Sequence, residues 1–531
     1  MIRFTFLLSF ILHLVSGVFL IDPRYHTYEE AVQELDSIAT LYPTITKLFN
    51  LGLSTRDSLP IWGIKISDNP AIKEDEPTIL FNGIHHAEEL LGCEVCLYLL
   101  NDLVSKYGID SAITYWINNA EIWIIPILNP EGHNVVMNGI DTIWRKNKRD
   151  NNNNGFFDPD SDGVDLNRNY DFNWEQGGSS NPGDEYYRGP YPFSENETRI
   201  VRNLAFQNHF VFDICYHCAR TGQGELVYYP WRWGNQFAID HPFIKRIADT
   251  LASKIINDAG NGTYVPIYGY ATEGNARNYL YGVCGTFAYT IEVSRSCYPP
   301  GYKVDSICMR NLPGAYYLLE RTFGSSITGT ITDSITNEPI VAEVRIIGYY
   351  DSTLASRMSD SLFGRYRRIL NPGTYSLQFR KQGYDTITIS NVVVLPGIPT
   401  ILNVKMSPLG IEESAISQSA IRNPKLEIYP NPFRNHCVIK YQIPNPKSQT
   451  NSNSQIPNKN LATYYPLLST LKIYDATGEL VRLWDYQTIR QSDHVVWSTK
   501  DNTGRRLSAG VYFIQFECEN YRKVEKVVLL E

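Results

Sequence analysis

The feature that most constrains the fold is an alternation of short apolar runs with stretches of helical periodicity between Tyr25 and Phe323. Short apolar runs indicate buried strands, whereas apolar residues that recur every three or four positions indicate helices. Strands alternating with helices favour an α/β domain whose mixed β-sheet is sandwiched by helices. The expected strands are Ile61–Ile66, Thr78–Phe81, Glu121–Leu128, Phe210–Tyr216, Glu225–Tyr229 and Phe287–Val293. The expected helices are Glu89–Val104, Glu195–Asn208, Pro242–Asp258 and Leu312–Phe323.

The N-terminal segment predicts export. Arg3 supplies a positive charge, Phe4–Val15 an apolar stretch and Val15-Ser16-Gly17 a small-residue cleavage site, so residues 1–17 read as a signal peptide. The alternative is a buried N-terminal strand. No other segment is apolar enough to span a bilayer, so we expect a secreted or surface protein without a membrane span after signal removal. Thr27 and Glu30 form a capping-box pattern, which predicts a helix from Tyr28.

The pattern changes after about Gly324 to short alternating strands, which predicts two small all-β sandwich domains after the α/β domain. We expect the α/β domain at residues 22–324, a β-sandwich at 325–408, a linker at 409–425 and a second β-domain at 426–531. Residues 445–460 are rich in Asn, Pro and Ser and are predicted to form a disordered loop. The first sandwich is expected to contain strands Ile327–Thr332, Ala342–Ile347, Gly373–Phe379 and Thr386–Val394.

The charge distribution excludes nucleic-acid binding, and the cysteine content limits the possible disulfides. The net charge is -8 and the Lys and Arg residues are dispersed, which excludes a basic stripe of the kind that binds nucleic acid. Nine cysteines leave at least one thiol unpaired. Cys297 with Cys308, and Cys437 with Cys518, are candidate disulfides, whereas Cys93, Cys96, Cys215 and Cys218 are expected to be buried thiols.

A polar cluster, Gly83–Glu89, lies between a predicted strand and a predicted helix. Both His85 with Glu88 and His86 with Glu89 satisfy the spacing His-x-x-Glu, which can bring an imidazole and a carboxylate to one metal ion. His217 follows a buried strand and is the natural third ligand, although a core histidine bonded to backbone is the alternative. Two histidines and one glutamate would leave a tetrahedral zinc with an open position.

Further chemistry-bearing residues lie near other strand ends. Glu292 sits in an apolar strand, where it could act as a general base or form a salt bridge with Arg295. Asn167 and Arg168 offer a fork for a carboxylate, and Arg145 could face an oxyanion. Taken alone, the segments that contain Arg145 and Asn167-Arg168 are each more typical of a solvated surface charge.

Several motifs together resemble the zinc carboxypeptidases of the carboxypeptidase A/B superfamily. These motifs, in order, are Gly83–Glu89, Asn129–Gly132, Trp144–Lys146, Gly163–Asn169, His217 and Glu292. The resemblance covers Tyr25–Phe323 and implies that His86, Glu89 and His217 bind one zinc ion, in preference to His85 and Glu88. It also implies that Glu292 is the general base, that Arg145 stabilises the oxyanion, and that Asn167 and Arg168 bind the substrate's terminal carboxylate. Tyr270 matches the family's mobile tyrosine, with Tyr268 as a rival.

One position departs from the family's pattern, and another predicts the substrate preference. Glu88 stands where the family usually has arginine, so one positive charge on the substrate side is missing. An ungapped comparison between Tyr270 and Glu292 places Arg277 at the floor of the side-chain pocket, which predicts a preference for acidic C-terminal residues. Asn278 is the alternative floor residue and would imply a more neutral preference.

A loop at residues 150–162 is similar to an EF-hand calcium loop, because oxygen-bearing side chains alternate around Gly155. Ser161 stands where such a loop needs Glu, and a plain Asn-rich surface turn is the alternative. Calcium is therefore a secondary expectation, after zinc.

The later domains carry resemblances of their own. Ile327–Asp333 and Asn371–Tyr375 resemble a transthyretin-like domain that follows some carboxypeptidases. Tyr429–Phe433, Ile473–Gly478, Gly510–Phe513 and Lys526–Leu530 resemble the Ig-like C-terminal sorting domains of bacterial secreted proteins. That resemblance implies the type IX secretion machinery as a partner, or membership of the related flagellar-hook-cap Ig-like group.

The resulting hypothesis is an exported zinc metallocarboxypeptidase that acts on peptides or proteins with a free C-terminus. A second enzymatic hypothesis is a cell-wall peptidase of the same superfamily that cuts γ-D-glutamyl bonds. A hypothesis from another class is a surface adhesin that keeps the fold without catalysis.

Overall fold

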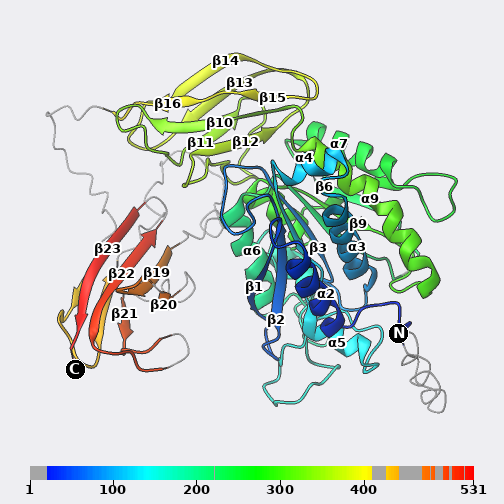
Figure 1. Ribbon diagram of the computed structural model, residues 1–531, viewed down its shortest axis with the longest axis horizontal. Helices are drawn as coiled ribbons and strands as arrows, with labels where there is room; N and C mark the ends of the chain where they lie inside the picture. The colour runs from blue at the N-terminus through cyan, green and yellow to red at the C-terminus, as the bar shows by residue number, and fades with distance from the viewer. Residues whose placement is uncertain are drawn as a thin grey trace. The chain divides into compact units, whose positions relative to one another are not determined.

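A computed structural model describes residues 21–220, 222–409, 426–441, 469–478, 480–484, 494–501, 505–518 and 521–530 (Figure 1). The chain divides into two units, residues 1–409 and 410–531, which are described separately. The predicted signal peptide at 1–17, the predicted loop at 445–460 and all but the first residue of the predicted linker at 409–425 lie outside the described residues.

Nine strands of the described chain form one mixed sheet in the first unit, in the order β1-β2-β4-β3-β5-β9-β6-β7, with β8 paired to β6. The central pairs β3–β4, β3–β5 and β5–β9 are parallel, whereas β1–β2 and β6–β9 are antiparallel. Strands β3, β4 and β5 are buried throughout, as expected for the centre of a sheet covered on both faces. The strands are β1 (Thr46–Leu53), β2 (Pro60–Ile66), β3 (Thr78–Gly83), β4 (Glu121–Ile125), β5 (Phe212–His217), β6 (Leu226–Trp233), β7 (Gln236–Phe237), β8 (Val265–Tyr270) and β9 (Phe287–Glu292).

Helices pack around this sheet, which confirms the predicted α/β class (Figure 1). The capping box is also confirmed, because the Thr27 hydroxyl accepts from the Glu30 N–H and the Glu30 carboxylate accepts from the Thr27 N–H. The last helix was predicted from Leu312 but begins at Val304, since Val304, Ile307 and Cys308 are buried at helical spacing. The α-helices are α2 (Tyr28–Leu41), α3 (Leu91–Lys106), α4 (Ser111–Ile117), α5 (Pro130–Met137), α6 (Asn196–Asn208), α7 (His241–Lys254), α8 (Ala276–Tyr279) and α9 (Val304–Arg321). Shorter helical turns are η1 (Leu166–Arg168), η2 (Trp174–Gln176), η3 (Leu280–Cys284) and η4 (Gly301–Lys303).

The cysteines of the α/β domain are free thiols. Cys93, Cys96, Cys215 and Cys218 are buried, as predicted. The candidate disulfide between Cys297 and Cys308 is wrong, because both thiols are free and buried. The two thiols have different charged neighbours. Glu94 and Arg24 act electrostatically on the Cys308 thiol, whereas Glu89 and Glu88 act on the Cys297 thiol. Cys437 is free, and the side chain of Cys518 lies outside the described residues.

The first unit ends in a β-sandwich with two sheets, ordered β12-β10-β15 with β16 paired to β10, and β11-β13-β14. The bulky side chains of Ile327, Val344, Leu377 and Phe379 are fully buried in its core. Its strands are β10 (Ser326–Asp333), β11 (Glu343–Ile346), β12 (Arg365–Ile369), β13 (Gly373–Arg380), β14 (Ile387–Val394), β15 (Pro399–Ile401) and β16 (Val404–Met406).

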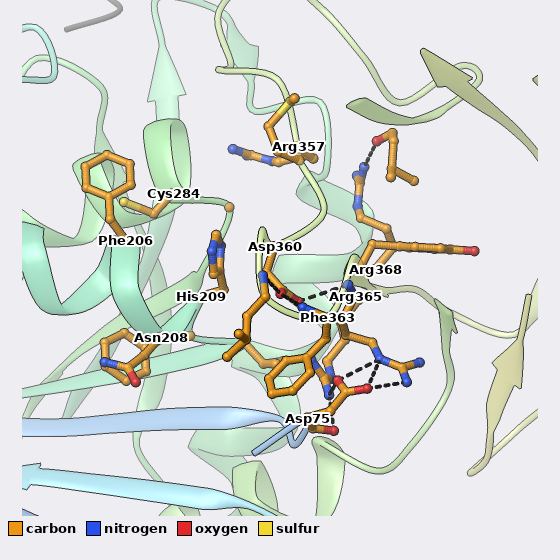
Figure 2. A pocket seen from close by; sticks show the side chains of 18 of the residues that line it. Asp75, Phe206, Asn208, His209, Cys284, Arg357, Asp360, Phe363, Arg365 and Arg368 are labelled. Atoms are coloured by element: carbon orange, nitrogen blue, oxygen red, sulfur yellow. Dashed lines mark hydrogen bonds and ion pairs between the residues drawn. The ribbon is translucent and has the colours of Figure 1, made fainter. Parts of the chain in front are cut away.

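A cavity of about 310 Å³ lies where this β-sandwich meets the α/β domain (Figure 2). Arg365 contacts Asp75 through three hydrogen bonds of 2.6–3.0 Å, and Arg367 donates to the Asp75 carbonyl at 3.0 Å. Arg357 donates to the carbonyl oxygens of Tyr281 and Gly282 at 2.7 and 3.2 Å. These contacts attach the sandwich to the α/β domain, and the cavity is separate from the polar cluster at Gly83–Glu89.

The second unit is all-β, which confirms the class predicted for it. Its described strands form sheets ordered β17-β18-β21 and β20-β19-β22-β23. A core that includes Phe433, Trp497 and Phe516 lies between these sheets. The strands are β17 (Leu426–Tyr429), β18 (Cys437–Tyr441), β19 (Ser469–Asp475), β20 (Leu480–Trp484), β21 (His494–Trp497), β22 (Gly510–Cys518) and β23 (Tyr521–Leu529).

Candidate metal and substrate site

Three buried side chains converge at the carboxyl ends of β3 and β5. His86 and Glu89 lie in the turn between β3 and α3, and His217 is the last residue of β5. His86 Nδ1 lies 2.8 Å from a Glu89 carboxylate oxygen, His217 Nδ1 lies 2.7 Å from the other, and the two Nδ1 atoms are 3.1 Å apart. Two imidazole nitrogens and a carboxylate oxygen within 4.8 Å of one another are a donor set that fits zinc.

Glycines bring this turn close to the neighbouring strand. A Cβ on Gly83 would lie 2.5 Å from the backbone of Gly92, and a Cβ on Gly92 would lie 2.9 Å from the Tyr216 carbonyl oxygen. Ile84, between Gly83 and the histidines, has a φ of 52°, which is strained for a β-branched residue. The turn is therefore held in place by the packing around it rather than by local backbone preference.

Asp165 orients the first histidine, a role that sequence reasoning missed. Its carboxylate lies 3.2 Å from His86 Nε2 and accepts from Arg145 Nε at 2.8 Å. Burial alone would raise the pKa of Asp165, but the charges of Arg145 and His86 hold it well below the usual range. An ionised carboxylate on Nε2 fixes the tautomer that leaves Nδ1 available to a metal.

His85 belongs to a second, adjacent group. Its Nε2 lies 2.9 Å from the Tyr170 hydroxyl, and its Nδ1 lies 3.0 Å from the Cys215 sulfur. That sulfur is also 3.0 Å from His217 Nε2, so His85, Cys215 and His217 likewise place donor atoms within 4.8 Å of one another. His217 therefore contacts Glu89 with one ring nitrogen and Cys215 with the other.

Glu292 faces the same edge of the sheet, because β9 pairs with β5 in a register that sets Glu292 beside His217. One of its carboxylate oxygens is buried without a hydrogen-bond partner among the described residues. Burial and then the Glu89 charge raise the pKa of Glu292 to about 8. The alternative salt bridge with Arg295 is not formed, since Arg295 instead binds Glu225 at 2.6 Å.

Arg145, Asn167 and Arg168 lie together beside these residues. The guanidinium carbons of Arg145 and Arg168 lie 5.0 and 5.7 Å from the centre of one ring, that of Tyr186. Asn167 accepts from the Ala276 N–H at 3.0 Å, and its amide nitrogen is 3.4 Å from His217 Nε2. The structure thus gathers the predicted carboxylate fork and the predicted oxyanion partner at one place.

Tyr270 lies at the end of β8 and is 56% exposed. The rival Tyr268 is less exposed, and its hydroxyl accepts from Arg232 at 3.0 Å. The amide nitrogen of Asn278 donates to the Tyr270 carbonyl at 2.6 Å, so that amide already serves to hold the strand end.

Arg277 is buried, with only 4% of its surface exposed. Its guanidinium donates to Glu273 at 2.6 Å and to the Thr290 hydroxyl at 3.2 Å, and it lies 5.5 Å from the Tyr228 ring centre. Its positive charge also opposes the upward shift of the Glu292 pKa.

Arg220 is a second residue that sequence reasoning missed. Its guanidinium donates to the buried Glu88 carboxylate at 2.7 Å and also binds Glu185. Arg220 follows His217 by three residues in a connection without periodicity, so no sequence signal marked it.

The loop at 150–162 forms hydrogen bonds within itself. The side-chain oxygens of Asp150, Asn152 and Asn154 accept from backbone N–H groups of the same loop, and Gly155 has a φ of 81°. Calcium binding there stays a prediction.

Profiles of three families match successive parts of the chain. Residues 31–313 match the zinc carboxypeptidase family, residues 326–407 a carboxypeptidase regulatory-like domain, and residues 427–530 a secretion system C-terminal sorting domain. The sorting domain confirms the predicted export and surface sorting. No helix in the described part of the chain is both long and apolar enough to cross a bilayer.

Similar curated proteins include a zinc carboxypeptidase of Saccharothrix mutabilis subsp. capreolus, which is 30% identical over 52% of this chain and 64% of the relative. Carboxypeptidase B of Astacus astacus is 30% identical over 51% of this chain and 86% of the relative. Metallocarboxypeptidase A of Trichophyton tonsurans is 34% identical, but the match spans only 33% of this chain and 40% of the relative. Several matches therefore span less than two thirds of the relative's length.

Solved structures show the same fold. Carboxypeptidase A from Helicoverpa armigera superposes with a TM-score of 0.50 at 23% identity, over 56% of this chain and 73% of that one. Thrombin activatable fibrinolysis inhibitor superposes with a TM-score of 0.50 at 22% identity, over 56% and 74%.

Proposed function

The chain belongs to the zinc carboxypeptidase family, and on that premise we propose that it is an exported metallocarboxypeptidase that removes C-terminal residues from peptides or proteins. The observation that carries this proposal is the convergence of His86, Glu89 and His217 beside Glu292, one of whose carboxylate oxygens is buried without a hydrogen-bond partner among the described residues. Burying a carboxylate oxygen without a partner costs several kcal/mol of folding free energy. A catalytic role in hydrolysis explains why the protein keeps such a group.

His86 Nδ1, His217 Nδ1 and the Glu89 carboxylate would hold the zinc ion. Bound zinc would polarise the scissile carbonyl and make a water molecule easier to deprotonate. Asp165 supports the site by keeping the His86 proton on Nε2 and by binding the Arg145 guanidinium, so that one carboxylate positions two functional groups.

Glu292 would take a proton from the attacking water and deliver it to the leaving amine. Its partly buried environment, which raises its pKa to about 8, favours a carboxylate that can both accept and return a proton near neutral pH. Arg145 would stabilise the oxyanion that forms as the carbonyl is attacked, because its guanidinium plane is held by Asp165 through Nε.

Asn167 and Arg168 would bind the free carboxylate at the end of the substrate. Arg168 is partly exposed, donates to the Asn167 carbonyl at 2.8 Å and lies against Tyr186, which restricts its guanidinium to this side of the site. A planar guanidinium beside an amide recognises a carboxylate through paired hydrogen bonds. Tyr270, exposed at the end of β8, would close over the bound residue.

Arg277 would select acidic C-terminal side chains. Gly269 makes room for its guanidinium, since a Cβ there would lie 1.8 Å from Arg277 Nη2. Glu273 already occupies one side of the guanidinium, so an incoming acidic side chain would share it with Glu273 or displace that carboxylate. If Asn278 formed the pocket floor instead, the preference would be neutral.

Two substitutions test the assignment of roles. Glu292→Gln should retain zinc and lose turnover by roughly 100-fold or more, because it removes only the base. His217→Ala should lose both zinc and turnover. Zinc content by atomic spectroscopy and hydrolysis of a peptide panel check the two expectations, with Glu320→Gln on the exposed face of α9 as a control.

Two results would overturn the proposal. Full turnover in Glu292→Gln would remove the proposed base. Purified parent protein that binds no zinc when it is supplied would instead favour the non-catalytic adhesin.

A further inference from the structure

A fourth arginine, Arg220, lies at the site and has no role in the proposed reaction. Its side chain is 33% exposed and is held on three sides: Nη2 donates to Glu88 at 2.7 Å and to the Ile143 carbonyl at 3.0 Å, and Nη1 binds Glu185. We propose that Arg220 is a substrate-binding residue that holds the peptide upstream of the scissile bond. This inference rests on the proposed carboxypeptidase function.

The charged groups form an ordered series. Asp165 interacts with both Arg168 and Arg145. Arg145 interacts in turn with Glu88, and Glu88 binds Arg220. Arg145 therefore shares one acidic neighbour, Asp165, with Arg168, and another, Glu88, with Arg220.

One surface segment connects the same three guanidiniums. The Tyr186 ring lies under Arg145 and Arg168, and the adjacent Glu185 binds Arg220. The Tyr186 hydroxyl is hydrogen-bonded to the Glu185 carboxylate. The three arginines thus line one continuous strip of the site rather than separate surfaces.

A bound peptide follows this strip in a defined direction. With its terminal carboxylate at Arg168 and its scissile carbonyl at Arg145, the chain must continue away from Arg168, toward Arg220. The next group in that direction is the carbonyl of the preceding residue, and a guanidinium N–H is a suitable donor to it.

The hydrogen bonds of Arg220 leave it able to act as that donor. A guanidinium has five N–H donors. Contacts with described residues use three of them, on Glu88, Ile143 and Glu185. The carboxylates of Glu88 and Glu185 also fix the side chain in place before substrate arrives, which reduces the entropy that binding must overcome.

Glu88 acquires a role from this arrangement. A positive charge is missing from the chain at position 88, but Arg220 brings a guanidinium within 2.7 Å of that side chain from a different element. Arg220, in the segment after β5, therefore supplies the positive charge that position 88 lacks. The buried Glu88 carboxylate is the ion-pair partner of Arg220.

The test compares substrates that differ only upstream. One is 3-phenylpropionyl-Xaa, whose single amide carbonyl is the scissile one, and the other is acetyl-Ala-Phe-Xaa, which adds upstream carbonyls. Xaa is whichever residue the parent enzyme releases fastest, so the test does not depend on Arg277. The principal variant is the double substitution Glu88→Gln with Arg220→Gln, because Arg220→Gln alone would leave a buried charge unpaired. Arg310→Gln, remote on α9, is the control.

We expect the double variant to lose roughly ten-fold more in kcat/KM on the tripeptide than on the acyl substrate, since a hydrogen bond to a charged group is removed. Arg220→Lys should recover part of that loss. The affinity for acetyl-Ala-Phe-Xaa, measured by calorimetry in the Glu292→Gln background, should fall by a similar factor. Equal losses on both substrates with unchanged affinity would overturn the role of Arg220. If the parent cleaves neither substrate, the proposed function fails, and the calorimetric comparison still decides on Arg220.

Discussion

Gly269→Ala should abolish the preference for acidic C-terminal residues while leaving the fold intact. The new Cβ would lie 1.8 Å from Arg277 Nη2 and 2.7 Å from its Cζ, so the guanidinium must retreat by roughly 1.5 Å to reach ordinary van der Waals separation. The obstructed atoms belong to the end of a flexible side chain, and the backbone of Gly269 is not in the left-handed region, so the substitution should not unfold the protein.

The displacement removes a charge-assisted hydrogen bond to the substrate side chain. Such a bond contributes about 2 kcal/mol, which corresponds to roughly 30-fold in kcat/KM. The assay is the ratio of kcat/KM for matched peptides ending in Glu and in Leu, with peptides ending in Lys as a third arm.

Gly262→Ala is the matched control, because its new Cβ would meet only the Asn257 side chain, at 3.1 Å. We expect the Glu/Leu ratio to fall toward unity in Gly269→Ala and to stay unchanged in Gly262→Ala. A parent enzyme that prefers Leu or Lys, or a Gly269→Ala variant that keeps the parent's ratio, would show that Arg277 does not select acidic side chains.

Two further predictions concern stability. Asp75→Ala should lower the free energy of unfolding by roughly 1 kcal/mol, because Arg365 and Arg367 lose their shared partner. Asp36→Ala, on the exposed face of α2, should leave the free energy of unfolding unchanged, and thermal unfolding checks both variants. Burial, and then the charges of Glu195 and Glu131, raise the pKa of Glu197 from 4.5 to about 8. Between these two pH values the folded protein keeps a proton that the unfolded chain releases, so the free energy of unfolding falls as pH rises. Glu197→Gln should therefore gain stability relative to the parent between pH 5 and pH 9 in urea titrations, and a constant difference would contradict the assignment.

The central strands of the α/β domain were predictable because they are buried along their whole length. Strands β1, β7 and β8 were not predicted, since most of their side chains are at least partly exposed and none of them forms a continuous apolar run. Strands β3 and β5 read as short, mostly apolar runs, and the turn after β3 carries its chemistry within seven residues. Strand β12 was missed, since its sequence Arg365-Tyr366-Arg367-Arg368-Ile369 has no apolar alternation. Its arginines instead bind groups of the α/β domain and of the sandwich, and those contacts exist only after folding.

The candidate site likewise contains residues that the sequence locates and residues that only the folded chain brings together. The three residues that would bind zinc lie next to strand ends, where sequence alone locates them. Two of the partners that position the site come from distant segments: Asp165 contacts His86, and Arg220 binds Glu88. A third, Gly269, is closer in the chain and makes room for Arg277. No periodicity joins these positions, because only the tertiary fold brings them within hydrogen-bonding distance.

In the proposed function, the protein is a zinc-dependent exopeptidase that requires a free C-terminal carboxylate. The most direct measurement is the rate of hydrolysis of one peptide in free-acid and C-terminally amidated form, with the zinc-loaded protein and after removal of zinc by a chelator. We predict that only the free-acid peptide is shortened, one residue at a time from its C-terminus, and that chelation stops the reaction until zinc is restored. Equal cleavage of the amidated peptide, or full activity without zinc, would contradict the account.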